Sequence, residues 1–240
     1  KALLSALASP DAVIAPSRFL ADQMRAYVPQ DRLHISRYGL DLTPFSNVQH
    51  YEERQTLGIG FVGQIMPHKG VHLLIAAFQQ LQARSRRIEL HIYGGLTANP
   101  AYVTRLRRLA GKDPRIHFHG RIENTSVPAT LASLDVAVVP STWYENSPLA
   151  IMEAHAAGTP VVTANIGGMA ELVRDGVDGL HFRFNDAADL ARVLQRLINE
   201  PDLLPRLRSG VQKPRSIEDE MVQILAIYDD AIARHATPVV

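Results

Sequence analysis

The 240 residues are enough to bury the core of one large domain or of one and a half smaller ones. The 25 basic and 24 acidic side chains nearly cancel, so no overall field attracts nucleic acid or an anionic membrane. The sequence has no cysteine, which excludes disulfides and cysteine-ligated metal sites and permits a reducing cytosol. No segment is apolar and long enough to cross a bilayer.

Residues 1–45 predict too few elements to close a sheet of their own. A strand at 11–16, a helix over 17–27 and a strand at 33–38 lead into a connector that contains Gly39 and Pro44. This section therefore belongs either to a domain that lies mostly outside the chain or to an edge of the domain that comes next in the sequence.

From about residue 56, apolar runs alternate with amphipathic helices, which is typical of a parallel sheet with crossover helices. We predict strands at residues 58–65, 88–94, 116–120, 136–140, 160–164 and 180–184. Such a pattern predicts an α/β fold with a doubly wound parallel sheet over residues 46–215, in which ligands bind at the carboxyl ends of the strands. Residues 216–234 predict a last helix, whose apolar stripe needs a surface to cover.

The segment 145–160, ENSPLAIMEAHAAGTP, places a pair of glutamates on either side of a helix start. Ser147 and Pro148 predict the N-cap and the first helical residue, so Glu145 lies in the preceding loop and Glu153 in the second turn. Burying Glu153 among its apolar neighbours without hydrogen-bond donors would be costly, which makes a ligand with hydroxyl groups a candidate partner. The amides of the helix start suit a phosphate. The simpler alternative is an ordinary loop acid and a glutamate at the rim of the core.

A second candidate element is FVGQIMPHKG at the end of the first sheet strand. Gly63 lets the backbone approach a ligand closely, and Lys69 can supply a charge to a phosphate. The loop is neither a Walker loop nor a GxGxxG motif, and a solvated lysine is the alternative. Because the strand ends share one edge, the lysine, the helix start and the glutamates would meet there. This set matches a diphosphate joined to polyols, which is what a sugar nucleotide is.

Glycines at other strand ends leave two interpretations open. Gly94-Gly95 and the segment Gly120-Arg121-Ile122 either pass close to a flat base or form ordinary turns. Gly167-Gly168 either starts a helix that points at the ligand or packs a helix tightly on a strand.

Aromatic side chains near these ends are also ambiguous. His117 and His119 share one face of a strand, where packing or a hydrogen bond is expected rather than a metal. Trp143 and Tyr144 beside Glu145 either line a sugar pocket or pack against the fold.

Together these motifs resemble the retaining glycosyltransferases of group 1, or family four, which have the two-lobed GT-B fold. Members carry a Glu-x7-Glu element followed by a Gly-x-Pro-Val-Val-like strand, here Glu145 to Glu153 and then GTPVVTANIGGMAELV. They also carry a Phe-Val-Gly-Arg-Leu-like strand that ends in Lys-Gly, here FVGQIMPHKG. The resemblance covers nearly all of residues 56–215. It implies a remnant of the N-terminal acceptor lobe with its linker at 1–45, the Rossmann-like donor domain at 46–215, and at 216–240 a helix that packs back toward the N-terminal lobe, with a tail.

The resemblance also implies roles for single residues. Lys69 would contact the donor diphosphate and Glu145 the hydroxyls of the transferred sugar, and these are the two implied catalytic residues. Glu153 would bind the ribose hydroxyls, and Ile122 would lie near the base. The implied donor-binding set is Gly63, Gln64, Lys69, Arg121, Ile122, Glu145, Asn146, Ser147, Pro148, Leu149 and Glu153. Gln64 replaces the family's arginine and removes a charge that helps to offset the diphosphate, and Arg121 is a candidate substitute.

The implied reaction is transfer of a sugar from a UDP-, GDP- or ADP-linked donor to an acceptor hydroxyl, with retention of configuration. A sugar or lipid-linked acceptor would bind the N-terminal lobe, which is mostly missing, so the chain alone is expected to bind the donor with little transfer. No cofactor or metal is required, since Lys69 and the helix dipole take the part of a divalent cation. A cytoplasmic location is expected, with peripheral attachment to the inner membrane face left open. The main alternative is a non-catalytic nucleotide-binding or interaction module on the same fold.

Overall fold

The computed structural model describes residues 6–7, 9–48, 55–83 and 86–236. The chain divides into two compact units. The larger unit comprises residues 43–213, and the smaller unit combines residues 1–42 with residues 214–240. Each unit is described by itself below.

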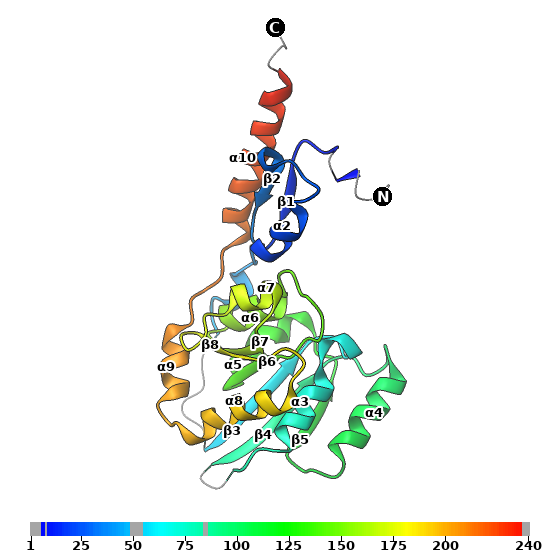
Figure 1. The fold of residues 1–240 in the computed structure, drawn as a ribbon. Helices are drawn as coiled ribbons and strands as arrows, with labels where there is room; N and C mark the ends of the chain where they lie inside the picture. Colours follow the sequence, from blue (N-terminus) through cyan, green and yellow to red (C-terminus); the bar gives the residue numbers. More distant parts are fainter. Residues whose placement is uncertain (1–5, 8, 49–54, 84–85, 237–240) are drawn as a thin grey trace. The chain divides into compact units, whose positions relative to one another are not determined.

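The larger unit is built on a parallel six-stranded sheet (Figure 1). Its strands are β3 (Thr56–Val62), β4 (Arg87–Tyr93), β5 (Ile116–Gly120), β6 (Val136–Val139), β7 (Val161–Ala164) and β8 (Gly179–Phe182). Their order is β5-β4-β3-β6-β7-β8, so the winding reverses between β3 and β6. The reversal opens a crevice at the carboxyl ends of the strands, where ligands of such folds bind. The predicted doubly wound α/β fold is confirmed.

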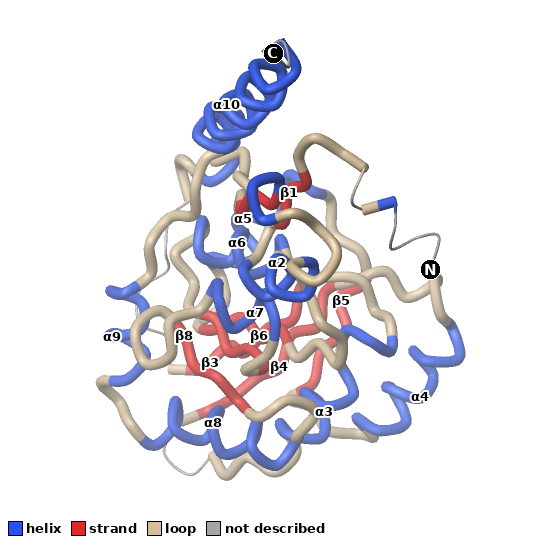
Figure 2. Tube along the Cα trace, turned by 45° about the horizontal axis from the view of Figure 1, so that its top comes forward, coloured by secondary structure: helices blue, strands red, loops and turns tan. Residues whose placement is uncertain are grey.

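Helices cover the two faces of this sheet in two layers (Figure 2). One layer contains α3 (Val71–Phe78), α4 (Pro100–Ala110) and α8 (Ala187–Asn199), and the other contains α5 (Val127–Ala132), α6 (Leu149–Ala156) and α7 (Gly167–Leu172). The unit also contains the helix α9 (Leu203–Gly210) and the 3-10 turns η2 (Thr43–Phe45), η3 (Pro67–Lys69) and η4 (Asn124–Ser126). The sheet and both layers share one apolar core, because side chains such as Ile59, Leu74, Ile151 and Leu194 are fully buried.

All the predicted sheet strands are present, but some of their ends differ. The first was predicted at residues 58–65 and is observed as Thr56–Val62. The prediction ran too far because Ile65 continues the apolar pattern, and Ile65 is indeed buried, with 1% of its surface exposed, although it lies outside the strand. The chain has already left the sheet at Gly63, whose φ is 158°.

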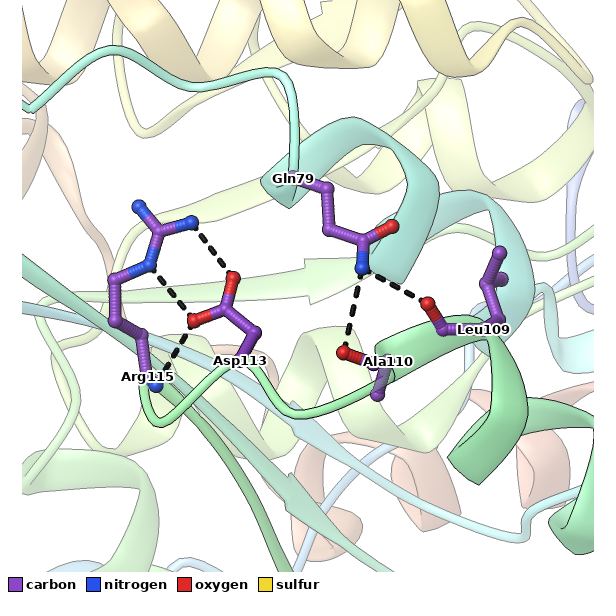
Figure 3. A network of polar contacts seen from close by, with 5 residues as sticks. All are labelled: Gln79, Leu109, Ala110, Asp113 and Arg115. Atoms are coloured by element: carbon purple, nitrogen blue, oxygen red, sulfur yellow. Dashed lines mark hydrogen bonds and ion pairs between the residues drawn. The ribbon is translucent and has the colours of Figure 1, made fainter.

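Side chains fix the turn that leads from α4 into β5 (Figure 3). The amide Nε2 of Gln79 donates to the carbonyl oxygens of Leu109 at 2.8 Å and Ala110 at 3.4 Å, which satisfies the end of α4. Arg115 donates to both carboxylate oxygens of Asp113, at 2.9 and 2.7 Å. The hydrogen bond from Arg115 lowers the pKa of Asp113. The start of β5 is thereby held in place, and its other end enters the candidate site.

In the smaller unit, β1 (Val13–Ala15) pairs in parallel with β2 (Leu33–Ile35). The helix α2 (Arg18–Met24) and the 3-10 turn η1 (Gln30–Arg32) connect these strands. The helix was predicted over residues 17–27 and is shorter, because Ser17 caps it by accepting a hydrogen bond from the amide of Leu20.

The helix α10 (Ile217–Ala236) completes the smaller unit. The amide of Gly39 donates to the carboxylate of Glu220 at 2.7 Å, and Gln223 Nε2 donates to the carbonyl of Ile35 at 2.9 Å. Of its predicted apolar stripe, Ile227 is buried, whereas Ile232 is 66% exposed. Within the described residues, no helix combines the length and the apolar character needed to cross a membrane.

Candidate functional site

The candidate site is a cavity of about 850 Å³ in the larger unit. It lies at the carboxyl ends of β3, β4, β5 and β6 and at the start of α6, which is the crevice that the strand order predicts. Its lining includes ten members of the predicted donor-binding set: Gly63, Gln64, Lys69, Arg121, Ile122, Glu145, Ser147, Pro148, Leu149 and Glu153. The remaining member, Asn146, is exposed and does not line the cavity.

Lys69 and Glu145 form an ion pair inside the cavity. The ammonium Nζ lies 2.6 Å from Glu145 Oε1, and the same oxygen accepts a hydrogen bond from Ser141 Oγ at 3.0 Å. Lys69 ends η3, and the next residue, Gly70, has φ 73°. A side chain at Gly70 would overlap the carbonyl oxygen of Pro140, so the glycine allows η3 to turn into α3 directly against the end of β6.

The loop that carries Glu145 is anchored on both sides. The amide of Thr142 donates to the carbonyl of His68 at 2.7 Å, and the carbonyl of Glu145 accepts from the amide of Gly168 at 2.9 Å. A Cβ at Gly168 would overlap the carbonyl oxygen of Asn146. The Gly167-Gly168 pair starts α7, as the first of the two interpretations expects, but neither glycine lines the cavity. Its close packing is against the loop that carries Glu145, and not between a helix and a strand.

The start of α6 differs from the sequence prediction. The helix begins at Leu149, and Pro148, with ψ 117°, occupies the N-cap position without a side-chain cap. Ser147 was predicted as the cap, which is wrong: its hydroxyl lies 3.8 Å from the sulfur of Met152 instead. The helix starts one residue later than predicted, and this places Ser147 outside the capping position. The first amides of α6, at Leu149 and Ala150, line the cavity without a side-chain cap to occupy them.

Glu153 projects from the second turn of α6 into the same cavity as Lys69. Its carboxylate is half-buried, and nothing in the described parts of the chain donates a hydrogen bond to it. Burial raises the pKa of Glu153. A donor from a ligand would offset this unfavourable desolvation.

Tyr93 and Ser141 are among the residues that line the cavity and that the sequence did not predict for the site. The ring of Tyr93 stacks on His119 with 4.3 Å between centroids and 11° between planes. His119 in turn hydrogen-bonds His91, with 3.0 Å between Nε2 and Nδ1. The expectation that His119 packs and hydrogen-bonds is confirmed. The signal for Tyr93 was its place directly before Gly94 at a strand end.

No metal-binding cluster is found in the part of the chain that the structure describes: no group of three or more His, Asp or Glu side chains is arranged to hold an ion. The cationic groups of the cavity are Lys69 and Arg121, and the cavity also has the helix start of α6. Arg121 is exposed at its edge, on the loop after β5.

Trp143 and Tyr144 do not line the cavity, as the first interpretation expected, whereas the second, packing against the fold, holds in part for Tyr144. They are 64% and 51% exposed and do not line the cavity. The Tyr144 ring lies 5.9 Å from that of Phe184, measured between centroids. Both aromatic side chains thus stand at the surface beside Glu145.

Comparison with known proteins assigns the fold of the larger unit. The chain is 30% identical over 246 residues to D-inositol 3-phosphate glycosyltransferase 1 of Catenulispora acidiphila, which covers 94% of this chain and 59% of that protein. Sucrose-phosphate synthase of Thermosynechococcus elongatus superposes with a TM-score of 0.80 at 25% identity, covering 97% of this chain and 61% of that one. HepE of Anabaena, in complex with UDP and glucose, gives a TM-score of 0.79 at 22% identity, covering 92% of this chain and 63% of that one.

The chain spans only about half of the curated relatives that it matches, 59% of the first and 43% of the second. The sequence profile described as glycosyl transferases group 1 matches residues 47–213, which is most of the chain and includes every residue that lines the cavity. The chain therefore belongs to the group 1 glycosyltransferases, and its larger unit has the Rossmann-like architecture of their GT-B fold.

Proposed function

We propose that the protein to which this chain belongs transfers a hexose from a nucleoside diphosphate sugar to an acceptor hydroxyl with retention of the anomeric configuration. The chain supplies the donor-binding part. The observation that carries this proposal is the single cavity that joins Lys69, the start of α6, Glu145 and Glu153. Its volume of about 850 Å³ suits a ligand of that size.

Each part of the donor has a chemical counterpart in the cavity. Lys69 and the first amides of α6 bind the diphosphate, because both present positive charge to an anion. Glu153 accepts hydrogen bonds from the ribose hydroxyls, and Glu145 accepts them from the transferred sugar. The base lies near Ile122. Structures of HepE with UDP and with UDP-glucose support a uridine nucleotide as the first donor to test.

The proposed chemistry uses attack from the face that the leaving group occupies. The bond between the anomeric carbon and the diphosphate oxygen breaks, the acceptor oxygen bonds to the same face of that carbon, and its proton passes to the departing phosphate. Lys69 and the α6 dipole stabilise the charge that develops on the diphosphate, so the proposal requires no metal ion. Glu145 is held by Lys69 and Ser141, which suits a hydroxyl-binding role rather than that of a covalent nucleophile.

Calorimetric titration tests donor binding directly. We expect the 240-residue chain to bind UDP, GDP or ADP, and to bind one of the corresponding sugar nucleotides with a distinct enthalpy. We expect little transfer until the remaining part of the protein is added. If none of these nucleotides or sugar nucleotides gives a heat of binding, the proposal is overturned.

Gln64 favours a second candidate, a nucleotide-binding module without transfer activity. It lines the cavity where the family carries an arginine, so the cavity has less positive charge to stabilise a leaving diphosphate. A full-length protein that binds the nucleotide sugar but neither transfers nor hydrolyses it would support this candidate. A cytoplasmic location with peripheral membrane attachment, and a sugar or lipid-linked acceptor, belong to the catalytic proposal.

A further inference from the structure

The strongest feature that the donor site does not use is the exposed aromatic pair Trp143 and Tyr144. The pair lies in the loop between Ser141 and Glu145, both of which line the cavity. Consecutive Cα atoms are about 3.8 Å apart, so the Cα of Trp143 lies at most about 7.6 Å from the Cα atoms of both cavity residues. The backbone of the pair therefore lies beside the cavity, although neither residue lines it.

The loop that carries these two side chains is anchored on both sides of them. Its backbone is bound at Thr142 to the carbonyl of His68, at 2.7 Å, and at Glu145 to the amide of Gly168, at 2.9 Å. Phe184 lies against the ring of Tyr144, 5.9 Å between centroids. With 64% of Trp143 exposed, most of the surface of the largest apolar side chain of the loop is open to contact. Exposed aromatic surface on an anchored loop is typical of a binding site.

We infer that Trp143 and Tyr144 form a platform for a saccharide ring of the acceptor. This inference rests on the proposed function, and it extends the acceptor site onto the donor-binding unit. The C–H groups on one face of a pyranose carry partial positive charge and suit the negative face of an aromatic ring. Rigid aromatic side chains give such contact area at a low cost in conformational entropy. Glu145 and the exposed Asn146 follow directly in the chain and can accept hydrogen bonds from the hydroxyls at the ring edge.

The position of the pair selects a saccharide over another occupant. An acceptor hydroxyl has to reach the anomeric carbon that Glu145 and Lys69 flank in the proposed complex. A ring stacked on Trp143 lies next to that point, because Trp143 precedes Glu145 by two positions in an anchored loop. The platform therefore predicts an acceptor that carries a sugar ring, rather than one that consists of an aliphatic chain alone.

Tryptophan fluorescence tests the inference, because Trp143 is the only tryptophan of the 240-residue chain. The probes are maltotriose, cellotriose and mannotriose, each titrated in the presence of UDP. We expect a saturable change in Trp143 emission with at least one trisaccharide. Tyr144→Ala should weaken that binding about fivefold or more, as expected for loss of an aromatic contact. Tyr228→Ala removes a tyrosine of comparable exposure, 57%, in the other unit and should leave the titration unchanged.

Calorimetry with UDP separates this inference from the proposed function. The platform is supported by two results together. UDP binds both the unsubstituted chain and Trp143→Ala, and the Trp143 emission of the unsubstituted chain changes when a trisaccharide is added. UDP binding without a fluorescence response to any trisaccharide overturns the platform and leaves donor binding intact. Emission that shifts with protein concentration alone would show that apolar protein surface covers the pair, and this also overturns the inference. Absence of UDP binding overturns the proposed function itself.

Discussion

The ammonium of Lys69 lies 2.6 Å from Oε1 of Glu145, which is 76 residues away in the sequence. The lysine follows β3 and the glutamate follows β6, so the ion pair spans the point where the winding of the sheet reverses. In the proposed complex, a diphosphate and a sugar hydroxyl compete with this pair for the same two groups. The pair therefore sets the charge that the cavity presents to a donor.

Substitutions of this pair should have opposite effects on nucleotide binding. Lys69→Ala should weaken UDP binding by about 1 to 3 kcal/mol through loss of a charged hydrogen bond. Glu145→Gln should not weaken UDP binding, since Lys69 is then no longer neutralised, but it should remove most of the additional affinity for the sugar nucleotide. Titration calorimetry measures both. Lys112→Ala, an exposed lysine that does not line the cavity, is the control, and a loss for Lys112→Ala equal to that for Lys69→Ala would contradict the prediction.

Glu153→Ala should weaken binding of the ribonucleotide by about 1 to 3 kcal/mol if the carboxylate holds the ribose hydroxyls. A deoxyribonucleotide gives the matched comparison. The unsubstituted chain should prefer UDP to dUDP, and Glu153→Ala should bind both equally, because the discriminating group is gone. If Glu153→Ala still prefers UDP to dUDP as strongly as the unsubstituted chain does, the ribose hydroxyls do not bind Glu153.

Burial raises the pKa of Glu153, which makes the binding of UDP dependent on pH. In the proposed complex, the carboxylate accepts the ribose hydrogen bonds in its ionised form. Affinity should therefore be full above the raised pKa and should fall as pH is lowered through it. Glu153→Gln should remove this pH dependence, and calorimetry over a pH series provides the measurement. A variant that keeps the pH dependence would assign it to another group.

Gln64→Arg should strengthen UDP binding, because it adds positive charge to the lining of the cavity. We expect a gain of about 0.5 to 1.5 kcal/mol, the range of an ordinary hydrogen bond, because the exposed position weakens the effect of the charge. The gain should shrink at high salt, since Gln64 is exposed and its replacement is screened. Gln64→Met is the neutral control, and a gain in both variants would show that charge is not the cause.

Gly168→Ala should disturb the loop that carries Glu145. The added Cβ overlaps the carbonyl oxygen of Asn146, so backbone has to move, and we expect a loss of about 1 to 3 kcal/mol in stability. Sugar-nucleotide affinity should fall with it. Gly95→Ala is the control for stability, because a Cβ there meets nothing within 4 Å. Equal urea midpoints for the two variants would refute the packing role of Gly168.

His155 on α6 should make stability fall in mild acid. Burial lowers its pKa, against the opposing effect of Asp178, and its Nε2 has no partner in the described part of the chain. The folded unit therefore favours neutral His155, so its contribution is complete above the unfolded pKa of about 6.5 and decreases as pH falls toward the folded pKa. His155→Leu should flatten the change in urea midpoint between about pH 7 and pH 5. A slope equal to that of the unsubstituted chain would exclude His155 as the cause.

Periodicity predicted the sheet because the strands of the larger unit are either short apolar runs, as in β6 and β7, or alternate apolar with polar residues, as in β4 and β5. The strand-end rule then brought Lys69 and Glu153 to one cavity without any knowledge of distances. The ion pair between Lys69 and Glu145 was not predicted, since it depends on how two loops pack and not on local sequence. Tyr93 was missed for the same reason, because its neighbour His119 comes from another strand.

The start of α6 shows where local rules fail. Ser147-Pro148 matches the usual start of a helix, yet the helix begins at Leu149. The hydrogen bond between the Glu145 carbonyl and the Gly168 amide fixes the backbone of the loop just before the helix. This tertiary contact, and not the local sequence, therefore determines the residue at which α6 begins. Tertiary contacts thus move the helix start by one residue relative to the local preference. That shift is enough to take Ser147 out of the capping position.

The smaller unit draws its two segments from either side of the larger one in the sequence. During synthesis, residues 1–42 leave the ribosome before residues 43–213. The hydrogen bonds of Gly39 with Glu220 and of Ile35 with Gln223 can form only after residues 214–236 have also left it. Residues 43–213 contain all the strands of their own sheet, so they can fold in the meantime. The larger unit is thus expected to complete its fold before the smaller unit, although residues 1–42 of the smaller unit are synthesised earlier.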